Sequence, residues 1–268
     1  MLVRYHLRMA KISIYKAKLY TRMKYKNIIN VKYESLARFV KDLPHRYDTE
    51  GLLIYDSRNK VRIFDIGGEK IVVKRFRRPT FYQRIDYTFF RPSKAKRAYQ
   101  YGLKLLSLGI STPEPIACVE EYKCGLFYQG YFISAFCGDP DARVLRDGTE
   151  GHEDLVDALA HFYVNMHQKG FLHGDTNLSN FLYKKDEKTN DYHITTIDVN
   201  RSHFLDNPSR EKCLYNLMRV THVRPTLKKI VQRYSELRGW DAEDAIRYVT
   251  QKLEAFERKK ELHRKMKK

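Results

Sequence analysis

Acidic residues are scarce in this chain relative to basic ones. Its 268 residues include 51 Lys and Arg but only 32 Asp and Glu, so the formal net charge at pH 7 is +19. A charge of that size predicts an anionic partner, such as nucleic acid, a phosphate-rich substrate or a membrane surface, and says nothing about the fold. The hydrophobic fraction of 43% is sufficient for a packed core and argues against a disordered chain.

Long apolar runs and metal-binding motifs are also missing. The longest stretch without Lys, Arg, Asp or Glu runs from Cys124 to Gly138, which is too short to cross a bilayer. Basic residues interrupt the apolar runs near the N-terminus, so we expect no signal peptide. The 4 cysteines form no C-x-x-C pair and the 10 histidines no H-E-x-x-H pattern. We therefore expect reduced thiols in a cytoplasmic protein, and no zinc site.

The order of predicted elements indicates an α+β chain with two lobes. We expect a basic N-terminal arm and lead-in over residues 1–50, a β-rich N-lobe over 51–138, and a helical C-lobe over 139–268. Residues 1–33 contain nine Lys and Arg and no acid, which predicts a basic arm or an amphipathic helix.

Hydrophobic periodicity places the elements of each lobe. In the N-lobe it predicts one helix over 93–108 and strands at 52–55, 61–64, 71–76, 116–119 and 130–136. In the C-lobe it predicts a helix through Leu155, Leu159, Phe162 and Met166 that ends at Gly170. A hairpin over 181–197 follows, and then two helical patterns over 214–237 and 246–256, the first broken near Pro225.

The segment His173-Gly174-Asp175-Thr176-Asn177-Leu178-Ser179-Asn180 lies between a predicted helix and a predicted strand. Phosphoryl transfer from ATP needs a carboxylate to orient the acceptor hydroxyl, oxygen ligands for magnesium, and a lysine on the α- and β-phosphates. Asp175 and Asn180 are five positions apart, which is the spacing of a kinase catalytic loop.

Two further residues complete this set. The predicted hairpin returns the chain so that Asp198 can lie beside Asn180, and Mg²⁺ prefers a few such oxygen ligands together with water. Upstream, Val72-Val73-Lys74 matches the strand-borne lysine of kinases. Any one of these residues alone would be an ordinary capping, turn or solvated side chain. Their joint occurrence, in order and on the required elements, favours a kinase.

This arrangement resembles the protein-kinase-like fold and, more narrowly, the lipopolysaccharide kinase family, the Kdo and heptose kinases of Gram-negative bacteria. The resemblance covers roughly residues 50–220 and rests on three segments: 108–117, 173–180 and 197–201. It implies that Asp175 is the catalytic base, that Asn180 and Asp198 hold Mg²⁺, and that Lys74 binds the phosphates of ATP. The implied acceptor is a Kdo or heptose hydroxyl on an anionic, lipid A-anchored glycolipid at the cytoplasmic face of the inner membrane.

Several features differ from typical protein kinases. His-Gly-Asp replaces His-Arg-Asp, and no Ala-Pro-Glu follows Asp198, which disfavours an atypical protein kinase. Ser57-Arg58-Asn59 stands in place of a Gly-rich loop, and the helix position expected to carry the Glu partner of Lys74 falls near Ala98, with Gln100 close by. These two features leave open a non-catalytic, kinase-like binding module.

Residues 75–104 combine cations with aromatic rings, and Asp86 is their only acid. The same composition is typical of segments that bind single-stranded nucleic acid and of segments that bind an anionic membrane surface. It also fits a solvated face whose aromatic residues lie in the core beneath it. Because the kinase motifs supply a context, we expect peripheral association with an anionic membrane rather than binding of nucleic acid. The residues concerned are Arg75, Arg77, Arg78, Arg84, Arg91, Lys94, Lys96, Arg97 and Lys104, interleaved with Phe76, Phe81, Tyr82, Tyr87, Phe89 and Phe90.

Overall fold

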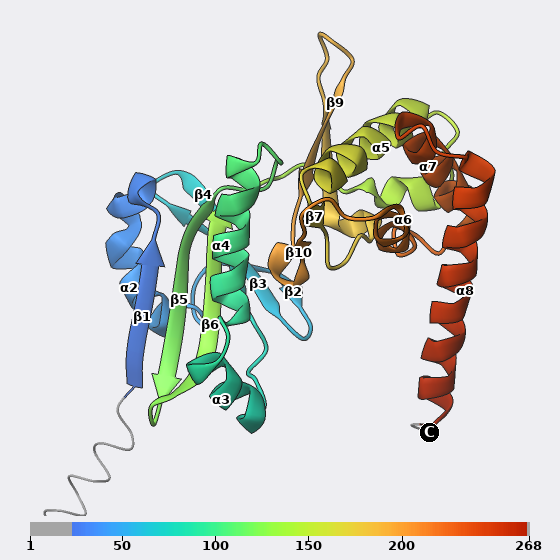
Figure 1. Ribbon diagram of the computed structural model, residues 1–268. Helices are drawn as coiled ribbons and strands as arrows, with labels where there is room; N and C mark the ends of the chain where they lie inside the picture. Colours follow the sequence, from blue (N-terminus) through green and yellow to red (C-terminus); the bar gives the residue numbers. More distant parts are fainter. Residues whose placement is uncertain (1–22, 267–268) are drawn as a thin grey trace, which may run out of the picture. The chain divides into compact units, whose positions relative to one another are not determined.

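The computed structural model describes residues 23–266, and the chain divides into two compact units. The first unit contains the described residues up to Leu103 together with Glu114–Phe136, and the second contains Lys104–Pro113 and the residues from Cys137 onward. The first unit is built on a β-sheet and the second on helices (Figure 1).

The first unit contains a six-stranded antiparallel sheet in the order β1-β5-β6-β4-β3-β2. All five strands predicted for this region are present, and β3 and β4 meet at the Gly67-Gly68 turn, where both glycines have positive φ. The strands are β1 (Met23–Ile29), β2 (Leu52–Asp56), β3 (Lys60–Ile66), β4 (Glu69–Arg75), β5 (Pro115–Lys123) and β6 (Leu126–Ala135).

Helices cover both faces of this sheet. On one face, α2 (Ala37–Arg46) buries Phe39 and Leu43 in a cluster with Val73 and Ile133 of the sheet. On the other face, α4 (Lys94–Ser107) brings Ala95, Ala98 and Tyr99 against Phe76 and Cys118. The remaining helices of this unit are α3 (Phe81–Phe89) and a 3-10 helix over Val31–Leu36. The predicted helix over 93–108 is therefore confirmed as α4.

The prediction of an arm or an amphipathic helix over residues 1–33 is wrong for residues 23–29. This segment is the edge strand β1, which pairs antiparallel with β5 from Met23 opposite Lys123 to Ile29 opposite Ala117. Lys24 and Lys26 are exposed on this edge. Charged side chains on an edge strand discourage pairing with other chains, so the basic composition fits a strand as well as an arm. Residues 1–22 of that prediction lie outside the described residues.

The second unit is mainly helical. Its helices are α5 (Glu153–Gln168), α6 (Arg210–Leu217), α7 (Arg224–Leu237) and α8 (Ala242–Lys265). The predicted hairpin is present as β8 (Phe181–Lys185) and β9 (Tyr192–Thr196), and a second pair is β7 (Phe171–Leu172) with β10 (His203–Phe204). Short 3-10 helices span Ala142–Arg146, Leu178–Asn180 and Val199–Arg201.

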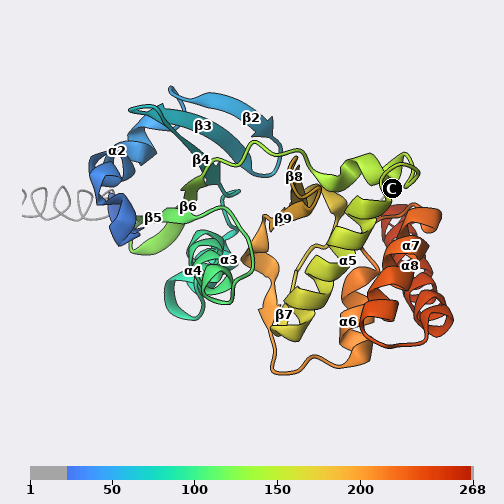
Figure 2. The ribbon, with the colours of Figure 1, turned by 90° about the horizontal axis from the view of Figure 1, so that it is seen from above.

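Helix α5 organises the core of this unit. The four apolar residues that predicted it are all buried, and α5 packs against α7, which in turn packs against α8 (Figure 2). Pro225 lies in the first turn of α7, where its missing N–H leaves no helical hydrogen bond unmade. The predicted break near Pro225 is therefore confirmed as the gap between α6 and α7. Within residues 23–266, no helix combines the length and the apolarity that crossing a membrane requires.

Candidate active site

The segment predicted to be a catalytic loop connects β7 to β8 in the second unit. Its last turn is the 3-10 helix Leu178–Asn180, in which the Asn177 side-chain oxygen accepts from the Ser179 N–H at 3.2 Å. Arg146 donates to the same oxygen at 2.6 Å. Leu178 is fully buried, so one side of the turn is anchored in the core while the polar residues around it remain accessible.

His173 ties this loop to the segment that carries Asp198. Burial lowers the pKa of the His173 imidazole, so the ring is neutral at physiological pH. Its Nδ1 accepts from the backbone N–H of Asp175 at 2.9 Å, so the proton is on Nε2, which donates to the Ile197 carbonyl at 2.9 Å. One side chain thereby fixes the spacing between Asp175 and the end of β9.

The hairpin brings Asn180 and Asp198 together, as the sequence predicted. Phe181 pairs with Thr196, and the Ile197 N–H donates to the Asn180 carbonyl at 2.9 Å. Asp198 adopts a left-handed conformation, with φ 60° and ψ 44°, which Asp tolerates better than most side chains do. Its carboxylate accepts a hydrogen bond from the side-chain amide of Asn200, which orients it within this turn.

Asn180 and Asp198, the two predicted magnesium ligands, both carry side-chain oxygen atoms of the kind that magnesium binds. The Asn180 amide nitrogen donates to the Asp175 carbonyl at 2.8 Å, so the amide oxygen is the atom of this side chain that could bind a metal. An amide oxygen beside a carboxylate fits Mg²⁺, which takes oxygen ligands and retains several waters. No cluster of three or more His, Cys, Asp or Glu suited to a metal occurs in the described part of the chain.

Asp175 is held by its backbone on both sides and projects its side chain outward. The Asp175 N–H donates to Nδ1 of His173, and the Asp175 carbonyl accepts from the Asn180 side-chain amide. The carboxylate is 34% exposed, and its Oδ1 lies 3.3 Å from Nη2 of Arg219. A fixed, accessible carboxylate of this kind can accept a hydrogen bond from an incoming hydroxyl and take its proton.

A buried hydrogen-bond network behind the loop was not predicted from the sequence. Asn216 of α6 donates to the His173 carbonyl at 2.8 Å, and its own carbonyl accepts from the Thr176 hydroxyl at 2.7 Å. The Asn216 side-chain oxygen bonds to His167 Nε2 at 3.1 Å, and His167 Nδ1 bonds to the Tyr234 hydroxyl at 2.8 Å. Asn216 therefore fastens the catalytic loop to α5, α6 and α7, although no motif marks it.

Lys74, the fourth predicted residue, belongs to the first unit. It lies on β4 opposite Phe132, on the sheet face that α4 covers, and its Nζ is 5.4 Å from the centre of the Phe76 ring. Ala98 is buried in the face of α4 that packs on the sheet, whereas Gln100 is exposed. The structure thus brings Asp175, Asn180 and Asp198 together within one unit and places Lys74 on the strand predicted for it.

Comparison with known proteins identifies the family. The profile of the lipopolysaccharide kinase (Kdo/WaaP) family matches residues 64–234, which is more than half of the chain. The chain belongs to this family. This lipopolysaccharide kinase is accordingly a phosphotransferase of the lipopolysaccharide core that uses ATP and acts on a sugar hydroxyl, and the predicted family is confirmed. A search of curated proteins finds no match.

Two solved structures are similar to this lipopolysaccharide kinase. One match is WaaP in complex with acyl carrier protein, at a TM-score of 0.59 and 16% identity, covering 88% of this chain and 98% of that one. Another is the Rio2 kinase–ADP/Mg²⁺–phosphoaspartate complex from Chaetomium thermophilum, at a TM-score of 0.46 and 16% identity, covering 96% and 86%. The WaaP match confirms the predicted α+β, two-lobed, protein-kinase-like fold.

Proposed function

We propose that this kinase transfers the γ-phosphoryl group of ATP to a hydroxyl of Kdo or heptose in the inner core, with Asp175 as the catalytic base. The observation that carries the proposal is the fixed backbone of Asp175, held by His173 on one side and Asn180 on the other, with its carboxylate accessible. That carboxylate would orient the sugar hydroxyl for in-line attack and take up its proton.

The other predicted residues would serve the nucleotide. Asn180 and Asp198 would hold Mg²⁺, which neutralises phosphate charge when it is bound. Lys74 would contact the α- and β-phosphates. The turn between β2 and β3 would take the place of a Gly-rich loop, since Asn59 accepts there from the Arg77 N–H at 3.1 Å and gives the turn a defined shape.

One observation favours a second candidate, a non-catalytic binding module of the same fold. The helix position expected to carry a Glu is the buried Ala98, which has no carboxylate. The polar residues of the predicted catalytic loop argue the other way, because a module without phosphoryl transfer has no need of a partly exposed Asp175 whose backbone is held on both sides.

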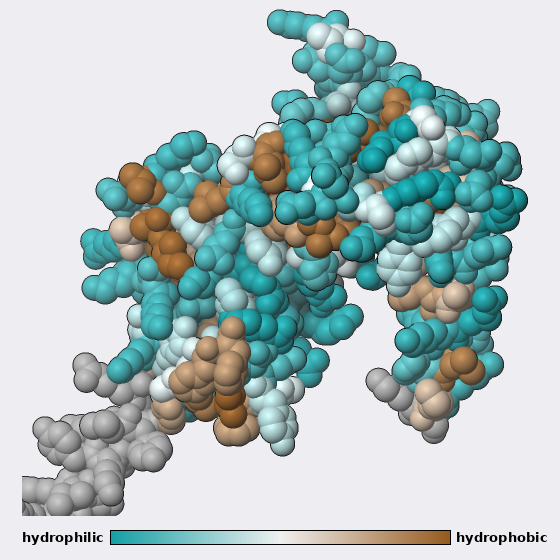
Figure 3. All heavy atoms as spheres, viewed as in Figure 1, coloured by the Kyte–Doolittle hydropathy of each residue, from teal (hydrophilic) through white to brown (hydrophobic). Residues whose placement is uncertain are grey.

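An anionic membrane surface is the proposed setting for the reaction. Around α3, Phe81, Tyr82, Phe89 and Phe90 each expose more than half of their surface, and Figure 3 shows hydrophobic side chains gathered over this helix. Exposed aromatic rings beside cations suit the interface of an anionic bilayer.

Not all of the nearby arginines are available for such a surface. Arg84 donates to the carbonyls of Phe127 and Lys123 at 2.9 and 3.3 Å, and Arg75 pairs with Asp48 at 2.8 Å. Arg77 is exposed, and Arg78 lies over the Tyr128 ring with its guanidinium 4.7 Å from the ring centre. A charge-reversal test of the membrane surface should therefore use Arg77 and Arg78, and leave Arg84 unchanged.

The acceptor is tested by incubation with magnesium-ATP and a panel of purified acceptors, read by mass spectrometry. The panel contains lipid A carrying Kdo alone and lipid A carrying Kdo and heptose. One added phosphate on either acceptor identifies the sugar class. Absence of phosphate on every acceptor, with ATP still bound, would favour the binding module.

Membrane association is tested separately by co-sedimentation with anionic vesicles at low and high salt. We expect binding that weakens with salt, and that falls in an Arg77→Glu/Arg78→Glu variant and in a Tyr82→Ser/Phe90→Ser variant. Binding that is absent at low salt, or equal in all three proteins, would rule out this surface.

A further inference from the structure

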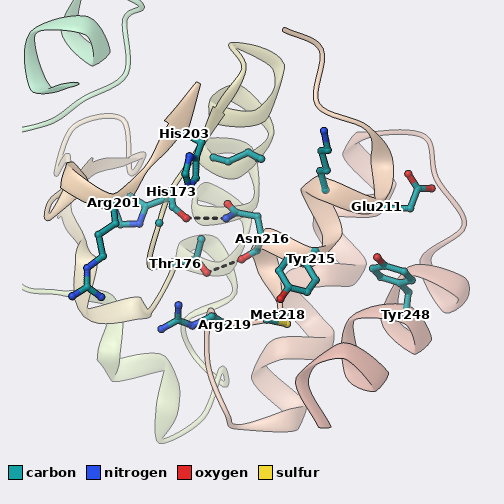
Figure 4. Close-up of a pocket in the computed structure, with 13 residues that line it drawn as sticks. His173, Thr176, Arg201, His203, Glu211, Tyr215, Asn216, Met218, Arg219 and Tyr248 are labelled. Carbon is teal, nitrogen blue, oxygen red and sulfur yellow. Dashed lines mark hydrogen bonds between the residues drawn. The ribbon is translucent and has the colours of Figure 1, made fainter. Parts of the chain in front are cut away.

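A pocket of about 390 Å³ opens beside the catalytic loop, entirely within the second unit (Figure 4). Its walls come from the loop, from the segment that follows Asp198, and from α6 and α8. We propose that this pocket binds the acceptor sugar, and that Arg201 and Arg219 recognise a carboxylate or phosphate group on that sugar. This inference rests on the proposed function and assigns the acceptor side of the same site.

The charge of the pocket favours an anion. Three basic residues, Arg201, Lys212 and Arg219, line it, whereas Glu211 is the one acidic lining residue. Among residues 23–266, no acidic side chain lies within ion-pair distance of Arg201. His173 also lines the pocket but is neutral, because its burial lowers its pKa. An oxyanion entering the pocket would therefore find an excess of cations.

Arg219 contacts Asp175 directly, whereas Arg201 lies near it through its backbone. The Arg219 guanidinium lies 3.3 Å from the Asp175 carboxylate, and it also stacks 5.4 Å from the centre of the Phe256 ring on α8. Arg201 is held through its backbone, since a Cβ on Gly174 would come within 2.4 Å of the Arg201 carbonyl oxygen. Only glycine allows this approach, so the Arg201 backbone packs against the residue that precedes Asp175, and the Arg201 side chain is exposed.

This placement solves an electrostatic problem of the proposed reaction. An acceptor that carries its own negative charge would be repelled by the ionised Asp175 as its hydroxyl approaches. A guanidinium between the two anions converts that repulsion into attraction, and its planar donors match a carboxylate or a phosphate in two-point contacts. Arg219, already paired with Asp175, occupies such a position.

The rest of the pocket suits a sugar ring. Tyr215 and Tyr248 contribute aromatic surface, and Tyr215 is 53% exposed. Figure 4 draws Arg201 and Arg219 on the side of the catalytic loop and Tyr248 on the opposite side. Apolar walls with a few convergent polar groups are typical of small-molecule sites, and the C–H face of a sugar can pack on such rings. The two arginines would take the anion, and the tyrosine rings would take the sugar ring, with Glu211 beside Tyr248 on that side of the pocket (Figure 4).

The test compares Arg201→Gln with Arg201→Lys and with a matched control, Lys228→Gln, an exposed cation on α7 outside the pocket. Steady-state kinetics are measured with three acceptors: the native acceptor, one whose phosphates have been removed, and one whose carboxylate has been converted to a neutral amide. Acceptor binding to each protein without ATP is measured in parallel, and thermal unfolding verifies that each variant is folded.

We expect Arg201→Gln to raise the KM for the native acceptor and weaken its binding by about tenfold or more, because a charged hydrogen-bonded contact is lost. The KM for ATP should stay unchanged, Arg201→Lys should restore part of the affinity, and Lys228→Gln should behave like the wild type. The wild type and Arg201→Gln should have equal affinity for the acceptor that lacks the recognised group. This comparison shows whether the pocket recognises a phosphate or a carboxylate.

Two results overturn the inference: an unchanged acceptor affinity in Arg201→Gln, or an equal loss of affinity for all three acceptors. Both can occur while the wild type phosphorylates the acceptor normally, so they leave the proposed function intact. If the wild type instead binds the acceptor in an Arg201-dependent way and never phosphorylates it, the proposed function fails and the assignment of the pocket stands.

Discussion

Acid should destabilise this protein through His167, a buried histidine of the network behind the catalytic loop. The side chain is 1% exposed and lies between Asn216 and Tyr234, with hydrogen bonds of 3.1 and 2.8 Å. Burial lowers its pKa from 6.5 to about 4, against a smaller opposite effect of the Asn216 hydrogen bond. The folded protein therefore holds His167 neutral, with Nε2–H donating to Asn216 and Nδ1 accepting from Tyr234.

The sign and size of the effect follow from this difference in pKa. Between pH 6.5 and 4 the unfolded chain binds a proton at His167 that the folded protein does not, so the free energy of unfolding falls as the pH falls. The contribution is complete above the unfolded pKa of 6.5 and is lost as the pH drops toward about 4. One pKa unit corresponds to roughly 1.4 kcal/mol, so the loss at His167 is about 2 kcal/mol at pH 5.

Urea unfolding at pH 7.5 and pH 5 measures this loss. His167→Gln keeps a hydrogen-bonding side chain that does not titrate, and His222→Gln removes an exposed histidine as the matched control. We expect wild type and His222→Gln to lose about 2 kcal/mol more than His167→Gln between the two pH values. The reasoning is refuted if all three proteins lose the same free energy, since His167 would then titrate alike in both states.

Three further predictions concern the site itself. In thermal-shift assays with ATP, Asp198→Ala should abolish the magnesium-dependent stabilisation. Asn180→Ala should weaken it less, because an amide carries no net charge. If the wild type and both variants depend equally on magnesium, neither residue is a ligand. Lys74→Ala should raise the KM for ATP and lower kcat. If this variant uses ATP normally, another cation binds the phosphates. Asn216→Ala should lower the free energy of unfolding by about 1–3 kcal/mol, by leaving the buried His173 carbonyl unsatisfied, and should lower kcat; an unchanged urea midpoint would contradict this.

The sequence predicted those parts of the fold that local patterns determine. The four apolar residues of α5 repeat at helical spacing and are all buried, and the hairpin of β8 and β9 follows from two short apolar runs around a polar turn. Because that hairpin returns the chain on itself, the sequence alone predicts that Asn180 and Asp198 lie close together. The family and the kinase-like fold are confirmed for the same reason, because the residues that mark them are contiguous or nearly so.

Features that depend on distant partners could not be predicted. Strand β1 pairs with β5, which lies far along the chain. With Lys24 and Lys26 exposed, β1 lacks the clear alternation of apolar and polar residues that marks a typical strand. Helix α3 was not predicted because its aromatic residues at both ends point to solvent and disrupt the apolar stripe of a helix. Asn216 contacts the catalytic loop only through the tertiary fold, and a single Asn on a helix carries no signal of such a role.

The most direct test of the account is a single-turnover measurement of phosphoryl transfer by Asp175→Asn. This substitution keeps the backbone hydrogen bonds to His173 and Asn180 and removes only the carboxylate that would take the hydroxyl proton. With ATP binding verified by thermal shift, transfer to the lipopolysaccharide acceptor should fall by at least about 10²–10⁴-fold. Transfer near the wild-type rate would contradict the assignment of Asp175 as the base, and with it the proposed mechanism.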